Sequence, residues 1–173
     1  DETKTMLLSK DKKQLIAYPS ATKDINIPDY ITSIGNFAFS GCHNIQNIKI
    51  PNSVTDIGKF AFYDCQKLTN IELPDSVKQI NEGVFYDCAN LINIKIPDSV
   101  KNIGIEAFSG CHNLKEIKLP QSLESIDNST FYECHSLESI TIPDTVTSIG
   151  KSAFSECTNL KKIKLPKSLT TIK

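Results

Sequence analysis

The sequence predicts an α/β solenoid of 23-residue repeats, with a parallel sheet on its concave side and short helical or 3₁₀ segments on its convex side. Three residue types recur every 23 positions: seven of the eight prolines, all six cysteines and six of the eight phenylalanines. A unit this short cannot bury its own apolar face, so copies must stack in register to close a core. The three series are Pro28, Pro51, Pro74, Pro97, Pro120, Pro143 and Pro166; Cys42, Cys65, Cys88, Cys111, Cys134 and Cys157; and Phe39, Phe62, Phe85, Phe108, Phe131 and Phe154.

Each unit is expected to contain one strand, which residues 97–119 illustrate. Ile117 and Leu119 alternate with Glu116 and Lys118, the period-two pattern of a strand with one buried face. A proline follows each such strand, and proline has no N–H group to donate to a ladder. We therefore expect every strand to end at the proline that opens the next unit.

The remainder of the unit is expected to return across the convex side. Val100 and Ile103 are predicted to point inward, and Gly104 allows a turn. A short helical or 3₁₀ segment of about two turns is then expected. It is indicated by apolar residues at helical spacing, Ala107, Phe108, Cys111 and Leu114. Because a helix this short is unstable alone, it would depend on packing against neighbouring units.

Stacking places equivalent residues over one another, and these columns form the predicted core. Beside the phenylalanines, the columns are Val54, Val77, Val100, Leu123 and Val146; Ile57, Ile80, Ile103, Ile126 and Ile149; Leu68, Leu91, Leu114, Leu137 and Leu160; and Ile71, Ile94, Ile117, Ile140 and Ile163. The cysteines occupy one inward position, so we expect buried free thiols and no disulfide framework.

Composition and spacing exclude several classes of function. The net charge of −1 argues against a nucleic-acid binder that relies on bulk charge, and no apolar run approaches the roughly 18 residues of a membrane span. No nucleotide loop, nucleophile motif or paired acids occur, so we expect neither an enzyme nor a cofactor. His43, His112 and His135 each follow a cysteine. Inward thiolates cannot join outward imidazoles, so we expect no metal site.

The unit reads Pro, x, Ser, Val, x, x, Ile, Gly, x, x, Ala, Phe, x, x, Cys, x, x, Leu, x, x, Ile, x, Leu, and it resembles the BspA-type leucine-rich repeat. Departures from this pattern are few, at Ile45, Asn81, Val84, Asp127 and Thr130. The resemblance implies an extracellular or cell-surface protein, typically bacterial. It also implies a role in adhesion or protein recognition and not in catalysis.

The resemblance also suggests how the chain is organised. Residues 1–27 would form an N-terminal hairpin cap and a half repeat, because Leu7–Tyr18 looks like the hairpin that introduces such repeats and Asp24–Ile27 aligns with a repeat strand. Residues 28–173 would form one continuous leucine-rich repeat solenoid, since the units leave no room for a linker.

The last unit stops at Lys173, partway through a repeat and without a distinct polar cap. Terminal coils of solenoids need capping to stay soluble. We therefore expect that the natural protein continues, that the chain was trimmed, or that a partner covers this coil, for example by end-to-end association.

Function in a solenoid usually resides where the repeat is free to vary, which here is the outward face of the predicted sheet. The candidate partner-binding residues, called the sheet strip below, are Asn47, Lys49, Asn70, Glu72, Asn93, Lys95, Lys115, Glu116, Lys118, Glu138, Thr141, Lys162 and Lys164. The second half of the strip is rich in lysine and would favour an acidic or sulfated partner. The chain has neither tryptophan nor arginine, so modest affinity is expected.

Two functions are consistent with this surface. The leading hypothesis is a secreted or cell-surface recognition or adhesion module that binds a protein or glycan, such as a host matrix or cell-surface component, through the sheet strip. The alternative is a structural spacer or assembly unit of a larger surface protein, with no ligand on the strip.

Overall fold

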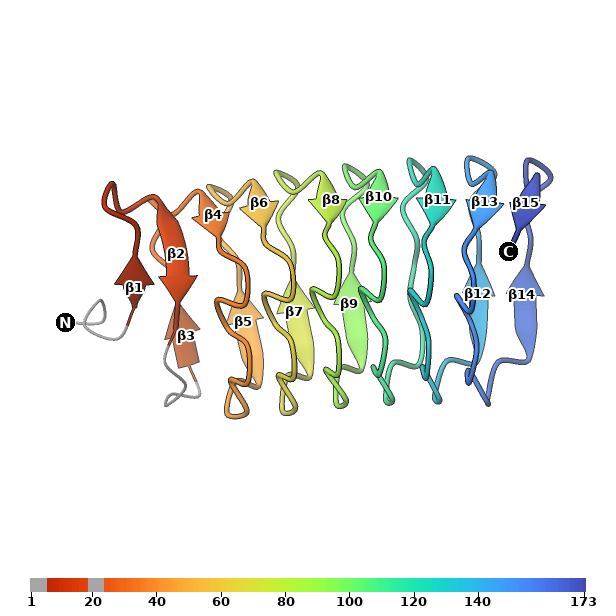
Figure 1. The fold of residues 1–173 in the computed structure, drawn as a ribbon, viewed down its shortest axis with the longest axis horizontal. Helices are drawn as coiled ribbons and strands as arrows, with labels where there is room; N and C mark the ends of the chain where they lie inside the picture. Colours follow the sequence, from red (N-terminus) through yellow and green to blue (C-terminus); the bar gives the residue numbers. More distant parts are fainter. Residues whose placement is uncertain (1–5, 19–23) are drawn as a thin grey trace.

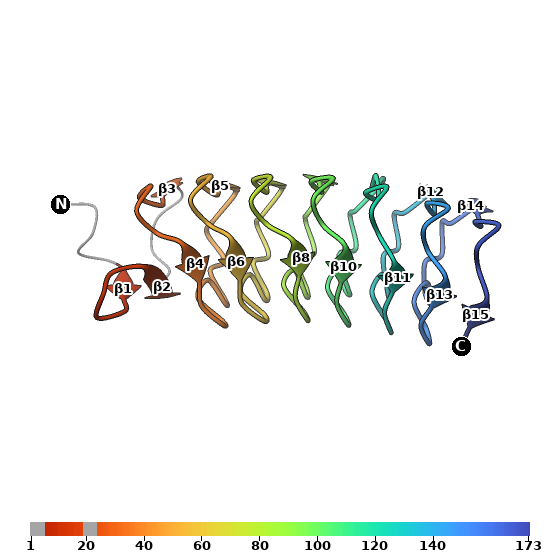
Figure 2. The same ribbon diagram turned by 90° about the horizontal axis from the view of Figure 1, so that it is seen from above.

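The chain forms an elongated stack of coils (Figures 1 and 2). The computed structural model describes residues 6–18 and 24–173. Along the stack run two sets of parallel strands, one of three-residue strands and one of two-residue strands. The three-residue strands are β3 (Asp24–Asn26), β5 (Asn47–Lys49), β7 (Asn70–Glu72), β9 (Asn93–Lys95), β12 (Ser139–Thr141) and β14 (Lys162–Lys164).

The three-residue strands form the sheet that the sequence predicts. They pair in parallel in the orders β3-β5-β7-β9 and β12-β14. Each residue lies opposite the one 23 positions later, as Ile48 lies opposite Ile71. The ladder is interrupted between β9 and β12, where a strand is predicted over Glu116–Leu119. That coil makes only an isolated bridge between Lys95 and Lys118.

A second parallel ladder, not predicted from the sequence, runs beside the first and is interrupted between β6 and β8. Its strands hold two residues each: β4 (Ser33–Ile34), β6 (Asp56–Ile57), β8 (Gln79–Ile80), β10 (Asn102–Ile103), β11 (Ser125–Ile126), β13 (Ser148–Ile149) and β15 (Thr171–Ile172). In β6, β8 and β10 an exposed residue precedes a buried isoleucine. The isoleucine column that includes Ile103 is therefore inward, as predicted, but it belongs to a strand.

The predicted helical or 3₁₀ segments are wrong for the described residues, in which this side of the coil consists of turns. The N–H groups of Phe108 and Gly110 donate to carbonyls of the next coil, Thr130 and Tyr132, both at 2.9 Å. The N–H of Cys111 instead donates three residues back, to Phe108, at 3.2 Å. Because alternate N–H groups bond between coils, a continuous i→i−4 ladder cannot form.

The role predicted for Gly104 is also corrected. The left-handed residue in this turn is Glu106, with φ 56°, two positions later. A Cβ on Gly104 would instead lie 2.8 Å from the backbone nitrogen of Glu82 in the preceding coil. Glycine at this position therefore allows two backbones to approach closely.

The core is continuous along the stack, and a ladder of phenylalanine rings forms part of it. Consecutive rings from Phe39 to Phe154 have centroids 5.0–5.6 Å apart and planes 3–16° from parallel. Tyr18 extends the ladder, with its ring 5.5 Å from that of Phe39. Each stacked pair contributes about 0.5–1.5 kcal/mol beyond its buried area.

Three members of the predicted core columns are not fully buried, and Phe154 is one of them. Ile163 in β14 is 41% exposed and Leu160 is partly exposed. The reason is their place in the stack, because β14 is the outermost strand of its sheet and no further coil of the described residues covers it. The equivalent residues of inner coils, such as Ile94 and Leu91, are buried.

The predicted hairpin is present as β1 (Leu7–Leu8) and β2 (Gln14–Ala17), which pair in antiparallel fashion. β2 then pairs in parallel with β4, so the hairpin lies at the first end of the second ladder. Residues 1–5 and 19–23 of the predicted first domain, including Pro19, lie outside the described residues. The capping role of the hairpin stays a prediction.

Candidate recognition surface

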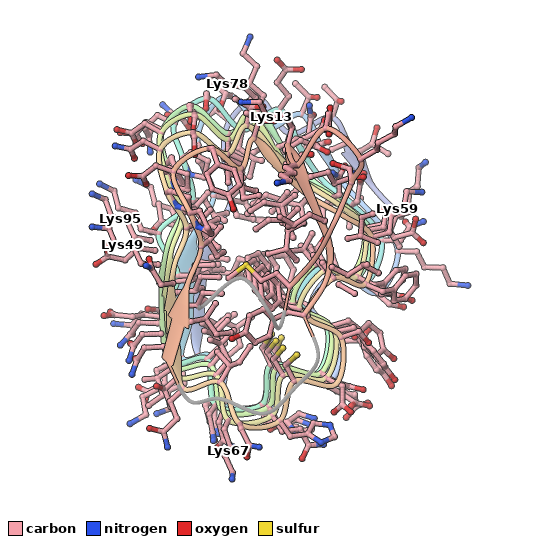
Figure 3. All side chains as sticks on the ribbon, turned by 90° about the vertical axis from the view of Figure 1, so that its left-hand side faces the viewer. Lys13, Lys49, Lys59, Lys67, Lys78 and Lys95 are labelled. Atoms are coloured by element: carbon pink, nitrogen blue, oxygen red, sulfur yellow. The ribbon has the colours of Figure 1, made fainter. Side chains whose placement is uncertain are left out.

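Side chains along each strand point alternately inward and outward, and the outward ones form the sheet strip. In β5, β7 and β9 the middle isoleucine is buried and the residues on either side are exposed. The coils are in register, so equivalent outward side chains form rows along the stack. All thirteen predicted residues of the strip are exposed. Figure 3, a view along the stack, shows Lys49 and Lys95 projecting from the same side of the sheet.

The first half of the strip presents amides and alternating charges. Asn47, Asn70 and Asn93 lie opposite one another on adjacent strands, and Nδ2 of Asn70 donates to Oδ1 of Asn47 at 3.3 Å. Glu72 likewise lies between Lys49 and Lys95. Within the described part of the chain, no ion pair within 4.0 Å joins Glu72 to either lysine. These charged groups are therefore available to a partner.

The second half of the strip is basic. Lys162 and Lys164 of β14 lie opposite Ser139 and Thr141 of β12, which are uncharged. Lys118 bridges to Lys95 in the neighbouring coil, so two like charges are adjacent there. The acidic residues are fewer. Glu138 lies 3.9 Å from Nζ of Lys161, a fully solvated pair that leaves most of the positive charge uncompensated.

Two shallow grooves follow the strip. One, of about 410 Å³, lies over β5 and β7 and is lined by Ile25, Asn47, Ile48, Lys49, Asn70, Ile71 and Glu72. The other, of about 560 Å³, is lined by Asn93, Ile94, Lys95, Glu116, Ile117, Lys118, Leu119, Gln121, Ser139, Ile140 and Thr141. The second groove spans the coil where the ladder is interrupted. Both grooves have an apolar floor with polar or charged residues along it, which suits an extended ligand.

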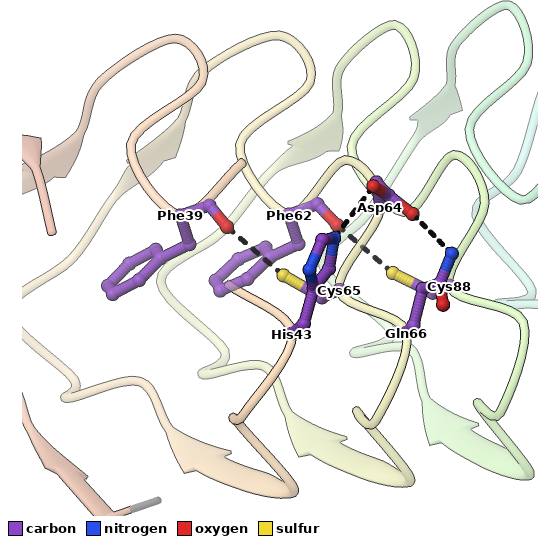
Figure 4. A network of polar contacts seen from close by, with 7 residues as sticks. All are labelled: Phe39, His43, Phe62, Asp64, Cys65, Gln66 and Cys88. Carbon is purple, nitrogen blue, oxygen red and sulfur yellow. Dashed lines mark hydrogen bonds and ion pairs between the residues drawn. The ribbon is translucent and has the colours of Figure 1, made fainter. Parts of the chain in front are cut away.

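The cysteines are free and buried, as predicted, but their hydrogen bonds were not expected from the sequence. Each thiol donates to a carbonyl oxygen of the preceding coil, as Cys65 and Cys88 donate to Phe39 and Phe62, both at 3.1 Å (Figure 4). Burial raises the pKa of Cys42 to about 12 and that of Cys157 to about 11. The thiols are therefore protonated at neutral pH and are poor nucleophiles.

The histidines lie along the outer turns, away from the thiols. Nε2 of His43 lies 2.8 Å from Oδ2 of Asp64 (Figure 4). The rings of His112 and His135 stack with centroids 4.7 Å apart, and His112 lies 3.5 Å from Glu133. Within residues 6–18 and 24–173, no cluster of three or more His, Cys, Asp or Glu side chains is placed to hold a metal ion.

One exposed cluster was not identified from the sequence. Phe37 and Phe60 share a repeat position two residues before the phenylalanine column, and their rings stack 5.3 Å apart on the outside of the coil. Tyr63 and Tyr86, for which the sequence predicts partial exposure and stacking, lie beside Phe60 with centroids 5.6 Å apart. The signal available in the sequence was aromatic residues at positions where other units have Gly, Glu or Ser.

No helix able to cross a membrane occurs among the described residues. The profile of the BspA type leucine-rich repeat region matches six copies over residues 16–99 and 78–173. No match was found among curated proteins.

Solved bacterial structures share the fold. A leucine-rich repeat protein of T. pallidum is 30% identical with a TM-score of 0.84, and the match covers 98% of this chain and 84% of that one. A leucine-rich repeat protein of Bacteroides ovatus is 32% identical with a TM-score of 0.65, covering 97% of this chain and 53% of that one. The pneumococcal vaccine antigen PcpA is 26% identical with a TM-score of 0.71, covering 96% and 45%. The chain thus spans about half the length of the last two.

The profile match, the 23-residue register of the coils and the similarity to these structures agree along nearly all of the chain. The chain belongs to the BspA-type leucine-rich repeat family.

Proposed function

We propose that this protein is a non-enzymatic recognition or adhesion module, extracellular or on the cell surface, that binds a protein or glycan through the sheet strip. One observation carries the proposal. The buried positions of successive coils repeat almost the same residues, whereas thirteen exposed strip positions vary between amide, acid, lysine and hydroxyl side chains, and nine of them line the two grooves. The fold itself needs only the buried set, so variation on one exposed face suits a binding function.

The similarity to a pneumococcal vaccine antigen and the family of the chain support an extracellular location. A host matrix or cell-surface component is the partner that such a location suggests. The lysine-rich half of the strip favours an acidic or sulfated group on that partner. Lysine provides a solvated point charge and no bidentate fork, so we expect modest affinity per module, increased by multivalency.

The test is binding of the purified chain to immobilised heparin and to extracellular-matrix and plasma proteins, across a salt series. Lys118→Glu with Lys164→Glu should weaken binding about tenfold, because two charge reversals act on one contact face. Lys78→Glu with Lys101→Glu is the matched control, since both lysines are exposed, lie outside the strip and change the net charge equally. Equal losses in the two double variants, or binding insensitive to salt, would contradict the proposal.

A structural spacer or assembly unit is the second candidate function. The observation that favours it is apolar exposure on the last coil, where Ile163, Leu165 and Ile172 are 41%, 46% and 63% exposed. Association through this coil should then be weakened by Leu165→Lys with Ile172→Lys. Sedimentation over a concentration series measures this association, and a monomer at every concentration would exclude assembly through the last coil.

A further inference from the structure

An aromatic patch lies on the outer turns of the first coils, and it consists of Phe37, Phe60, Tyr63 and Tyr86. Phe37 is 55% exposed, and its ring is nearly parallel to that of Phe60, with centroids 5.3 Å apart and planes 7° from parallel. The ring of Phe60 also contacts those of Tyr63 and Tyr86, at 6.3 and 6.4 Å. Four aromatic side chains therefore form one connected surface.

The patch lies on the opposite side of the coil from the sheet strip. Figure 3 shows Lys59, the residue before Phe60, projecting away from Lys49 and Lys95. The core fills the space between the two sides, with the rings of Phe39 and Phe62 completely buried. A partner held on the patch would therefore leave the strip accessible.

The fold does not require aromatic residues at these positions. Phe37 and Phe60 have φ of 57° and 54°, but the equivalent residues of later coils adopt the same conformation with short or polar side chains. Those residues are Gly83, Glu106, Ser129 and Ser152. Serine therefore supports the left-handed turn as well as phenylalanine does, and the turn does not need an exposed aromatic ring. A strained, exposed apolar residue such as Phe37 suggests a binding role.

Glycine at one of these positions makes room for the patch. A Cβ on Gly83 would overlap the ring of Phe60, so this ring lies directly over the glycine backbone. Phe60 is consequently held between Phe37 and the next coil, with Tyr63 and Tyr86 at its edge. The aromatic patch is therefore preorganised, which reduces the entropy lost when a ligand binds.

The surroundings of the patch are negative. Burial raises the pKa of Asp87, and the nearby carboxylate of Asp64 raises it further, while His112 acts in the opposite direction. The pKa of Tyr86 is raised by burial and then by Asp87 and Glu106. In the described residues neither Asp87 nor Glu106 has an ion-pair partner within 4.0 Å. Some of the other acids are paired: Glu82 lies 2.9 Å from Lys59 and Asp64 lies 2.8 Å from His43.

We propose that the aromatic patch binds a segment of a partner protein that presents arginine or lysine. Aromatic faces attract such cations within about 6 Å of the ring centroid, and arginine also stacks on them. The exposed ring of Phe37 provides the face at one end of the patch, and the unpaired carboxylates of Asp87 and Glu106 provide complementary charge at the other end, beside Tyr86. The partner is opposite in charge to the one proposed for the lysine-rich strip, so the two surfaces bind different molecules.

The test uses the full chain and a fluorescein-labelled peptide that alternates arginine with glycine, followed by fluorescence anisotropy. Phe37→Ser with Phe60→Ser should weaken binding about tenfold or more, because the cation loses the exposed ring of Phe37 and the ring of Phe60 that supports it. Ser129 and Ser152 show that serine adopts this backbone conformation here. Asp87→Asn with Glu106→Gln is a second, purely electrostatic variant, expected to weaken binding several-fold and to reduce its salt dependence. Circular dichroism and thermal unfolding confirm that each variant is folded.

Two controls separate this proposal from the function of the strip. The strip variant Lys118→Glu with Lys164→Glu should bind the peptide at least as well as the unmodified chain. A peptide with glutamine in place of arginine should bind at least tenfold more weakly. The proposal is overturned if the serine variant binds normally or if the glutamine peptide binds as tightly. Self-association that is lost in the serine variant would also overturn it, because the occupant would then be a second copy of the chain.

Discussion

Each cysteine contributes to the core as a hydrogen-bond donor as well as an apolar side chain. From Cys65 onward the thiol bonds to a carbonyl that also accepts an N–H within its own coil, as Phe39 accepts from Cys42 N at 3.1 Å and from Cys65 Sγ at 3.1 Å. The carbonyl oxygen thus accepts two hydrogen bonds, and the bond from the thiol links each coil to the previous one. The spacing of the cysteines indicates burial, but the thiol bond depends on how far one coil lies from the next, which the sequence does not state.

The raised pKa of these thiols predicts that stability falls in alkaline solution. In the unfolded chain a thiol loses its proton near pH 9, whereas Cys157 and Cys42 in the fold have pKa values of about 11 and about 12. Their stabilising effect is complete below about pH 9 and is lost as pH rises through about 11 for Cys157 and about 12 for Cys42, at roughly 1 kcal/mol per pH unit for each thiol. Urea unfolding at pH 8, 9 and 10 measures this slope. A Cys42→Ala variant should show a smaller slope, and an unchanged one would contradict the assignment.

Among the elements, the predicted sheet, its register and the phenylalanine column are confirmed because each follows from periodicity alone. The alternation around Ile48 and Ile71 marks a strand, and the constant 23-residue spacing sets its register. The two-residue ladder and the turns could not be predicted in the same way. A strand such as Asn102–Ile103 is too short to show an alternation of apolar and polar residues. The N–H of Phe108 bonds to the next coil, so its conformation depends on a neighbour and not on local residues.

The phenylalanine ladder predicts that a given substitution costs more in the middle of the stack than at its end. Phe85 is completely buried between Phe62 and Phe108, at 5.6 and 5.4 Å. Among the described residues Phe154 has one ring neighbour, Phe131, and it is only partly buried. Phe85→Leu should reduce the free energy of unfolding by about 1–3 kcal/mol, through lost stacking and poorer packing. Phe154→Leu, the matched control, should cost less than half as much by denaturant unfolding. Equal costs would mean that stacking contributes little.

At the scale of the whole molecule, a net charge of −1 conceals two unlike sides. Lysines gather on the sheet strip, whereas the unpaired carboxylates of Asp87 and Glu106 lie beside Tyr86 in the aromatic patch. The strip was predictable because outward positions in a strand follow from alternation. The patch was not, because its four aromatic residues come from three coils and meet only through the turns that replace the predicted helices.

The stack also predicts a gradient of local stability along its length. Coils of a solenoid are stabilised mainly by their neighbours, and burial follows this rule: Ile94 in β9 is 6% exposed, whereas Ile163 in β14 is 41% exposed. Amide hydrogens of β7 and β9 should therefore exchange at least tenfold more slowly than those of β14. Hydrogen–deuterium exchange with mass spectrometry at low protein concentration measures the difference. Uniform protection at every concentration would contradict a nearest-neighbour stack. Protection of β14 that increases with concentration would instead show that a second chain covers the last coil, because an added coil supplies the missing neighbour.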